Sequence, residues 1–160
     1  MTRSARQLRT RFARFAGAAL VLLWAPVAVG QEMPRTPGEF YRAGERFAHC
    51  SAHFAFTARI AREQGLPDNA VAFEGMERGW RLAGLMLLTE GLDPVRQPQV
   101  QDLFANLQSA KLDQIKAWRE LEPQTYSKTM LDDFQANCAP WTDLQKSIIA
   151  AMRGAAAPTN

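Results

Sequence analysis

The stretch FAHCSAHFAF, residues 47–56, places several chemically versatile side chains at helical spacing. Glu45, His49 and His53 follow one another at intervals of four, so on a helix they lie along one ridge. Two histidines at i and i+4 can share a metal ion, and a carboxylate can add a third ligand. Glu45, His49 and His53 are therefore a candidate metal site. The alternative is a solvated ridge beside the core, with His53 partly packed.

The same stretch contains one of the two cysteines of the chain, Cys50 and Cys138. Cys50 lies between Phe47 and Phe54 on an apolar stripe, and Cys138 follows Phe134 by four residues on another. An even pair in an oxidising compartment indicates a disulfide first. The crosslink closes a loop of 88 residues (138 − 50), which in the loop-entropy model stabilises the fold by roughly 4–5 kcal/mol. The alternative, a redox couple, usually has Cys-x-x-Cys spacing, which this sequence lacks.

Other catalytic signatures are missing from the sequence. A c-type haem requires Cys-x-x-Cys-His, and HCSAH is one cysteine short. The sequence contains neither a nucleophile elbow nor a Gly-rich phosphate loop. Asp132 and Asp133 are adjacent, so on a helix they point about 100° apart and are predicted to lie on a solvated face. We therefore predict a protein that is not an enzyme and holds no cofactor.

The first thirty residues have the pattern of a secretory signal. Their basic part carries five arginines and no acid, and the apolar stretch AGAALVLLWAPVAVG follows. This stretch is shorter than the roughly 20 residues of a membrane-spanning helix. We predict cleavage between Gly30 and Gln31, export by the general secretion route to the periplasm or the exterior, and no stable membrane anchor thereafter. The alternative is an uncleaved anchor.

Cleavage would change the charge of the protein. The whole chain has 19 basic and 16 acidic residues, a net charge of +3. Removing the five arginines leaves 14 basic residues against 16 acidic ones, a net charge of −2. Nucleic-acid binding depends on a basic stripe that neutralises phosphates, and residues 31–160 carry none. We therefore predict no nucleic-acid partner.

The elements that position the cysteines and histidines are helices. Thr36, Pro37 and Glu39 form a complete helix start with a capping box, and Gly65 is a typical helix end. These signals predict a first helix over residues 37–64. A second helix is predicted to begin with Asp68 or Asn69 as its cap and to end at Gly91. Its apolar stripe includes Met76 and Trp80, and its glycines at 75, 79 and 84 predict close approach of a neighbouring helix.

Prolines indicate the remaining helix boundaries. Pro98 is predicted to start the third helix and Pro123 to close it, with the fourth helix beginning near Thr125 or Ser127. Met130, Leu131, Phe134 and Cys138 are predicted to be buried in this last helix. Pro140 removes a helical hydrogen bond, so the helix is kinked or broken there before it ends at Gly154.

These elements predict an all-α fold, a four-helix antiparallel bundle stapled by one disulfide. Residues 31–36 form a short lead, residues 37–153 a single domain, and residues 154–160 a disordered tail.

The functional hypothesis rests on apolar residues that lie outside the main apolar stripes of the helices. Leu85, Met86 and Leu88 belong to a run of four apolar residues, and Phe56 and Ile60 lie off the main seam of the first helix. Burial beneath the following loop is one interpretation of the run, and an apolar partner surface is the other. We predict an exported helical bundle that binds a protein partner or an envelope component, or forms a homodimer. The alternative function is metal binding by Glu45, His49 and His53.

Overall fold

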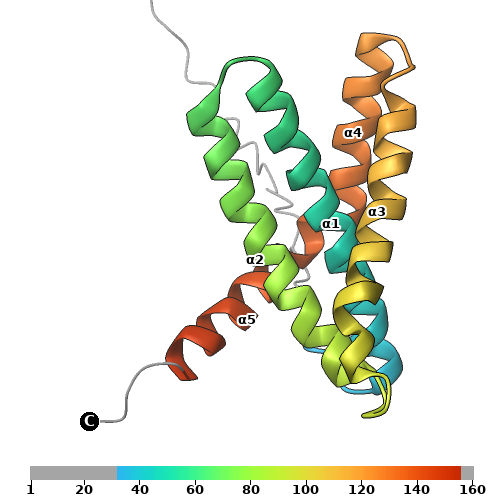
Figure 1. Cartoon of the computed structure of the whole chain (residues 1–160), viewed down its shortest axis with the longest axis vertical. Helices are drawn as coiled ribbons and strands as arrows, with labels where there is room; N and C mark the ends of the chain where they lie inside the picture. Colours follow the sequence, from blue (N-terminus) through green and yellow to red (C-terminus); the bar gives the residue numbers. More distant parts are fainter. Residues whose placement is uncertain (1–31, 156–160) are drawn as a thin grey trace, which may run out of the picture.

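The computed structural model describes residues 32–155, so the predicted signal segment and the last five residues lie outside the described residues. The elements are α1 (Pro37–Glu63), α2 (Pro67–Gly91), η1 (Gln97–Gln99), α3 (Val100–Trp118), α4 (Pro123–Asn137), η2 (Ala139–Trp141) and α5 (Thr142–Ala155). The helices α1 to α4 run alternately up and down, and α5 leaves the bundle at a steep angle (Figure 1). Residues 32–155 contain no strand, and the predicted all-α antiparallel bundle is confirmed.

The first helix begins and ends as its local sequence predicts. Thr36 Oγ1 accepts a hydrogen bond from the backbone N–H of Glu39, and the Glu39 carboxylate accepts one from the backbone N–H of Thr36. These two bonds satisfy donors that a bare helix start leaves unpaired. Gly65 has φ = 72°, the left-handed conformation in which glycine avoids the steric cost of a side chain.

Three helix starts differ from the prediction, and a proline lies near each. α3 starts at Val100 and not at the predicted Pro98, which lies in the 3₁₀ turn η1. Pro67 and Pro123 each occupy the first turn of a helix, α2 and α4 respectively, instead of preceding or closing one. Proline suits this position because its missing N–H has no helical acceptor there and its φ is already helical. The predicted caps Asp68, Asn69, Thr125 and Ser127 therefore lie inside helices.

The core lies mainly between α1, α2 and α3, and its largest fully buried side chains are Phe47, Phe56, Phe104, Leu88 and Ile115. A Cβ atom at Gly44 would lie 2.6 Å from Leu88 Cγ, and one at Gly84 would lie 2.6 Å from the Phe104 ring. Both glycines thus permit close helix packing, as predicted for Gly84. Met76 and Leu131, by contrast, are about half exposed, so their predicted burial is wrong.

The chain breaks its last helix where Pro140 requires it. α4 ends at Asn137, a single 3₁₀ turn contains Pro140, and α5 starts in a new direction at Thr142 (Figure 1). α5 then packs Leu144 and Ile148 into the core cluster that contains Phe47 and Trp80. It extends through Gly154 to Ala155, slightly beyond the predicted end. Within residues 32–155, none of the helices has the length and apolarity needed to cross a membrane.

Candidate functional site

The cysteine of the HCSAH stretch is part of a disulfide. Cys50 on α1 is bonded to Cys138 at the end of α4, with Cα atoms 5.6 Å apart, a typical separation. Both cysteines are fully buried. Because both cysteines are paired, no free thiol is available for redox or nucleophilic chemistry. The predicted disulfide is confirmed.

The two histidines of the predicted ridge lie in different environments. His53 is buried, and its Nε2 lies 2.5 Å from Asp133 Oδ2 on α4. His49 and Glu45 are half-buried. Within residues 32–155, no group of three or more His, Cys, Asp or Glu side chains is arranged to hold a metal ion. The alternative, a solvated ridge with His53 partly packed, thus underestimated the burial of His53, and metal binding by Glu45, His49 and His53 stays a prediction.

His53 belongs to a buried polar cluster that joins three helices. Lys111 on α3 donates a hydrogen bond to Asp133 Oδ1 over 2.9 Å, and Asn137 donates to the same oxygen over 3.0 Å. Arg46 on α1 donates in turn to Asn137 Oδ1 over 2.5 Å. We call these five residues the buried polar cluster. Its carboxylate receives donors from α1, α3 and α4, which satisfies a charge that would be costly to bury alone.

Burial and hydrogen bonding set the ionisation of the cluster. Burial lowers the pKa of His53, and the hydrogen bond to Asp133 opposes this shift without cancelling it, so the imidazole is neutral at pH 7. Burial raises the pKa of Asp133, but hydrogen bonds from Lys111 and His53 outweigh it and leave that pKa below its usual value. The Lys111 ammonium also lies 4.8 Å from the centre of the Trp118 ring.

The cluster contains no hydroxyl or thiol group. The nearest hydroxyl along the chain, that of Ser51, instead donates to Glu77 on α2 over 3.0 Å and accepts from Gln108 on α3 over 2.7 Å. Ser51 and His53 are two residues apart on α1, so they point to different sides of the helix. This separation argues against a serine–histidine–acid arrangement of these residues.

Sequence reasoning placed Asp133 on a solvated face, and that is wrong. Asp133 is half-buried inside the cluster, whereas Asp132 is exposed and pairs with Lys128. The position of Lys111 in the sequence is the signal from which the cluster could have been predicted. It lies four residues after Leu107 and four before Ile115, on the inward stripe of α3, where a lone lysine needs a buried partner.

The predicted apolar partner surface is mostly buried. Phe56 and Leu88 belong to the core, so their assignment to an accessible surface is wrong. Ile60 and Leu85 are half-buried and pack against core clusters. Only Met86 of the five is exposed. The exposed large apolar residues of α2 are instead Val71, Met76, Leu82 and Met86.

A groove between α2 and α5 adjoins this exposed apolar face. One cavity of about 490 Å³ has Phe54, Trp80 and Phe134 among its lining residues. A second, of about 450 Å³, extends it toward Leu82 and Met152, and the two share Gly75, Gly79, Ile149 and Arg153. We call the two together the α2–α5 groove. Each cavity has a volume typical of ligand sites.

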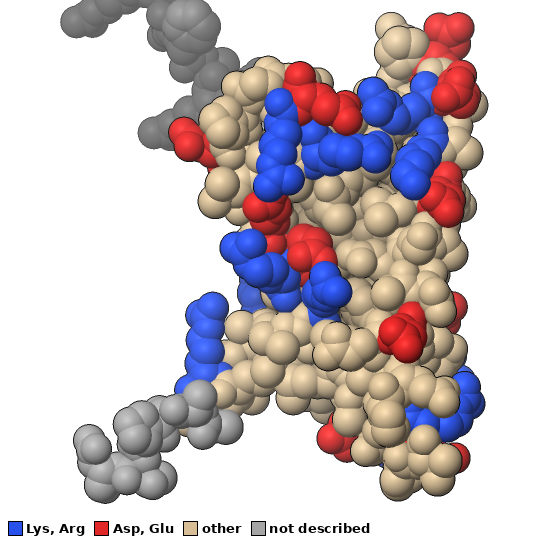
Figure 2. Space-filling view, viewed as in Figure 1, with Lys and Arg blue, Asp and Glu red and all other residues tan. Residues whose placement is uncertain are grey.

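The charged side chains that line the α2–α5 groove are all cationic: Arg78, Lys146 and Arg153. Lys146 lies 3.4 Å from Asp143 on its own helix. Figure 2 shows basic side chains over the middle of α2, with acidic side chains next to them, and basic side chains over α5. The lower part of α2 presents an uncharged surface. An apolar groove with this rim is matched by an apolar ligand that carries negative charge.

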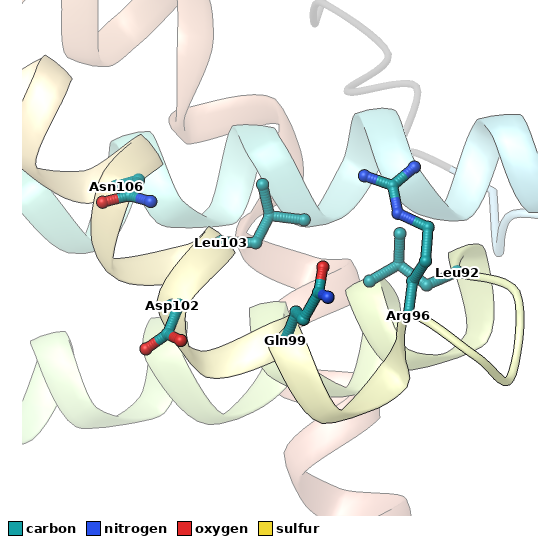
Figure 3. Close-up of a pocket in the computed structure, with 6 residues that line it drawn as sticks. All are labelled: Leu92, Arg96, Gln99, Asp102, Leu103 and Asn106. Carbon is teal, nitrogen blue, oxygen red and sulfur yellow. The ribbon is translucent and has the colours of Figure 1, made fainter.

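A smaller pocket of about 240 Å³ lies where α2 ends and α3 begins (Figure 3). Its lining is mostly polar and carries both charge signs, with Arg96 on one side of the pocket and Asp102 on the other. Two leucines, Leu92 and Leu103, supply the apolar part. This pocket lacks the aromatic lining of the α2–α5 groove and is about half the volume of either of its cavities.

Comparison with known proteins found no matching family model, no similar curated protein and no similar solved structure. The candidate site therefore rests on the sequence and on the geometry of this chain.

Proposed function

We propose that this chain is the precursor of an exported, non-enzymatic helical protein that binds a protein partner or an envelope component through the α2–α5 groove. The signal-like segment 1–30 supports export, and a buried disulfide suits an oxidising compartment such as the periplasm. The observation that carries the binding function is the groove itself, an aromatic-lined apolar hollow on an otherwise well-packed bundle.

The internal hydrogen bonds of the other polar side chains support a binding role over a catalytic one. His53 and Asp133 are bonded to each other, and Ser51 is bonded to Glu77 and Gln108. A general base or nucleophile must reach a substrate atom. These side chains instead form hydrogen bonds to other residues inside the bundle. In contrast, the groove is open at the surface and lined by side chains suited to apolar contact.

The fluorescent dye 1-anilinonaphthalene-8-sulfonate, an apolar anion, tests the groove as a binding site. We expect saturable dye binding to the native exported protein. The variants Gly75→Trp, which fills the groove, and Leu82→Glu, which places a carboxylate at its edge, should each weaken binding at least about tenfold. The matched control is Leu121→Glu, which changes an exposed leucine in the turn between α3 and α4, away from the groove.

Circular dichroism and thermal melting must show that each variant keeps the native fold, because this dye also binds loosely packed states. Equal dye binding by wild type, Gly75→Trp and Leu82→Glu would rule out the groove as the site. No dye binding at all to the native protein would do the same.

A further inference from the structure

We infer that the α2–α5 groove receives an acidic amphipathic helix of a partner protein, which lies lengthwise along α2. This inference rests on the proposed function and adds the chemistry of the partner. Three features of the described residues support it: a long exposed stripe, a glycine without a packing role in this chain, and a rim of one charge sign.

The stripe runs along the side of α2 that borders α5, and Gly79 within it is half-buried because Gln145 of α5 lies over it. Val71, Gly75, Gly79, Leu82 and Met86 follow one another at intervals of four, four, three and four residues, so they share one side of the helix. Val71 is 62% exposed, Leu82 44% and Met86 40%. The stripe spans about 22 Å at about 1.5 Å per residue, four helical turns. A second helix can make contacts at i, i+4 and i+7 over this length.

Gly75 distinguishes this face from the internal interfaces. A Cβ atom at Gly84 would lie 2.6 Å from Phe104, which explains that glycine by packing within the chain. A Cβ atom at Gly75 would meet only the Arg78 guanidinium of its own helix, 3.9 Å away. Glycine inside a helix costs about 1 kcal/mol relative to alanine. At Gly75 the bare backbone allows another chain to approach closely.

The charges around the stripe select the sign of the partner. Arg78 and Arg153 line the groove, and neither has a carboxylate within 4.0 Å among residues 32–155. Glu77, the acid beside Arg78 in sequence, is turned inward to Ser51. Acidic residues that flank the apolar face of an incoming helix would pair with these arginines, whereas basic residues would be repelled.

The same charges argue against a second copy of this chain as the occupant. A twofold contact through this face would bring together the same patch from both protomers. Arg78, Lys146 and Arg153 would then face like charges with no carboxylate of the groove between them. A separate acidic protein avoids this repulsion.

Two model peptides of 18 residues test the inference on the purified exported protein. Both are fluorescein-labelled helices with the same leucine and alanine stripe, one flanked by glutamates and the other by lysines. We expect saturable binding of the glutamate peptide, measured by fluorescence anisotropy, and at least about tenfold weaker binding of the lysine peptide. The double variant Arg78→Glu/Arg153→Glu should reverse this preference.

The control double variant Arg96→Glu/Lys116→Glu makes the same change in net charge at exposed positions away from the groove. It should keep the preference of the wild type. A preference reversed equally by both double variants would show net charge to be the cause and would overturn the inference. Equal binding of the two peptides, or none of either, would also overturn it.

The dye experiment separates the two levels of the proposal. Dye binding that depends on Gly75 and Leu82, without peptide binding, would support the groove as a binding site and contradict the acidic helix as its partner. Absence of both dye binding and peptide binding would contradict the groove as a binding site and the acidic helix as its partner. Binding to phosphatidylglycerol vesicles that Arg78→Glu/Arg153→Glu abolishes, without peptide binding, would overturn the inference in favour of a lipid. A dimer in sedimentation that Leu82→Glu dissociates would overturn it in favour of a second copy.

Discussion

His53 on α1 and Asp133 on α4 meet inside the bundle, with Nε2 2.5 Å from Oδ2, and Lys111 on α3 reaches the same carboxylate over 2.9 Å. A single carboxylate thus connects three helices. Lys111 is only 7% exposed, so its positive charge depends on this partner.

Replacing Asp133 should therefore be strongly destabilising. We expect Asp133→Asn to lower the free energy of unfolding by about 3–5 kcal/mol, because it leaves the Lys111 charge buried without a counter-ion. Asp132→Asn, an exposed neighbour, should change it by less than about 0.5 kcal/mol. Urea denaturation measures both values. Similar effects of the two substitutions would show that the Lys111–Asp133 pair contributes no more to the free energy of unfolding than an exposed residue does.

Stability should fall as the solution is acidified below about pH 6.5, the ordinary pKa of histidine. The pKa of His53 is lower in the folded state than in the unfolded chain, so the unfolded chain binds a proton first. The stability gained from keeping His53 neutral is present above the unfolded pKa and is lost as pH falls toward the folded pKa. His49 acts in the same direction because burial also lowers its pKa.

Urea midpoints at pH 7.5, 6.5 and 5.5 measure this dependence. The wild type should lose stability at each step downward, and His49→Gln should reduce the slope without removing it, since His53 remains. A midpoint that stays constant or rises on acidification would contradict the ionisation assigned to the cluster.

The disulfide should supply a large part of the stability. The double variant Cys50→Ala/Cys138→Ala should unfold with about 2–5 kcal/mol less free energy than the oxidised protein. Dithiothreitol should bring the wild type to a similar stability, and it should leave the double variant unchanged. Sensitivity of the double variant to dithiothreitol would point to an effect other than this bond.

Two glycines of α2 should respond in opposite directions to the same substitution. Gly84→Ala should destabilise the protein by about 1–3 kcal/mol, because its methyl group would lie 2.6 Å from the Phe104 ring. Gly75→Ala should stabilise it by about 0.5–1 kcal/mol, because alanine favours the helix and space is open there. Thermal melting distinguishes the two. Destabilisation by Gly75→Ala would reveal a packing constraint at that position.

Local signals predicted much of the fold. The capping box of Thr36 and Glu39, the left-handed Gly65 and the break around Pro140 all involve residues within a few positions of each other. The Cys50–Cys138 bond was also predictable, because each cysteine lies on an apolar stripe. The starts of α2 and α4 were placed wrongly because a proline, here Pro67 or Pro123, is compatible with both the end of one helix and the first turn of the next.

The candidate site was less predictable, since it depends on which helices become neighbours. Hydrophobic periodicity gives the inward face of one helix, but it does not identify Asp133 of α4 as the partner of Lys111 of α3. Nor does it show that Leu88 is covered by α1 and α3 while Leu82, earlier on the same helix, is left at the edge of a groove. These outcomes follow from the crossing of helices and from the new direction of α5.

The position of the disulfide next to the break has a consequence for α5. Cys138 is fixed to α1, so the 14 residues of α5 start from a base that stays attached to the core. If α5 separates from α2, it remains a tethered segment whose effective concentration at α2 is set by the few residues from Cys138 to Thr142, in the millimolar range for short flexible linkers. The wall that α5 gives the groove is therefore rebuilt intramolecularly whenever α5 leaves α2.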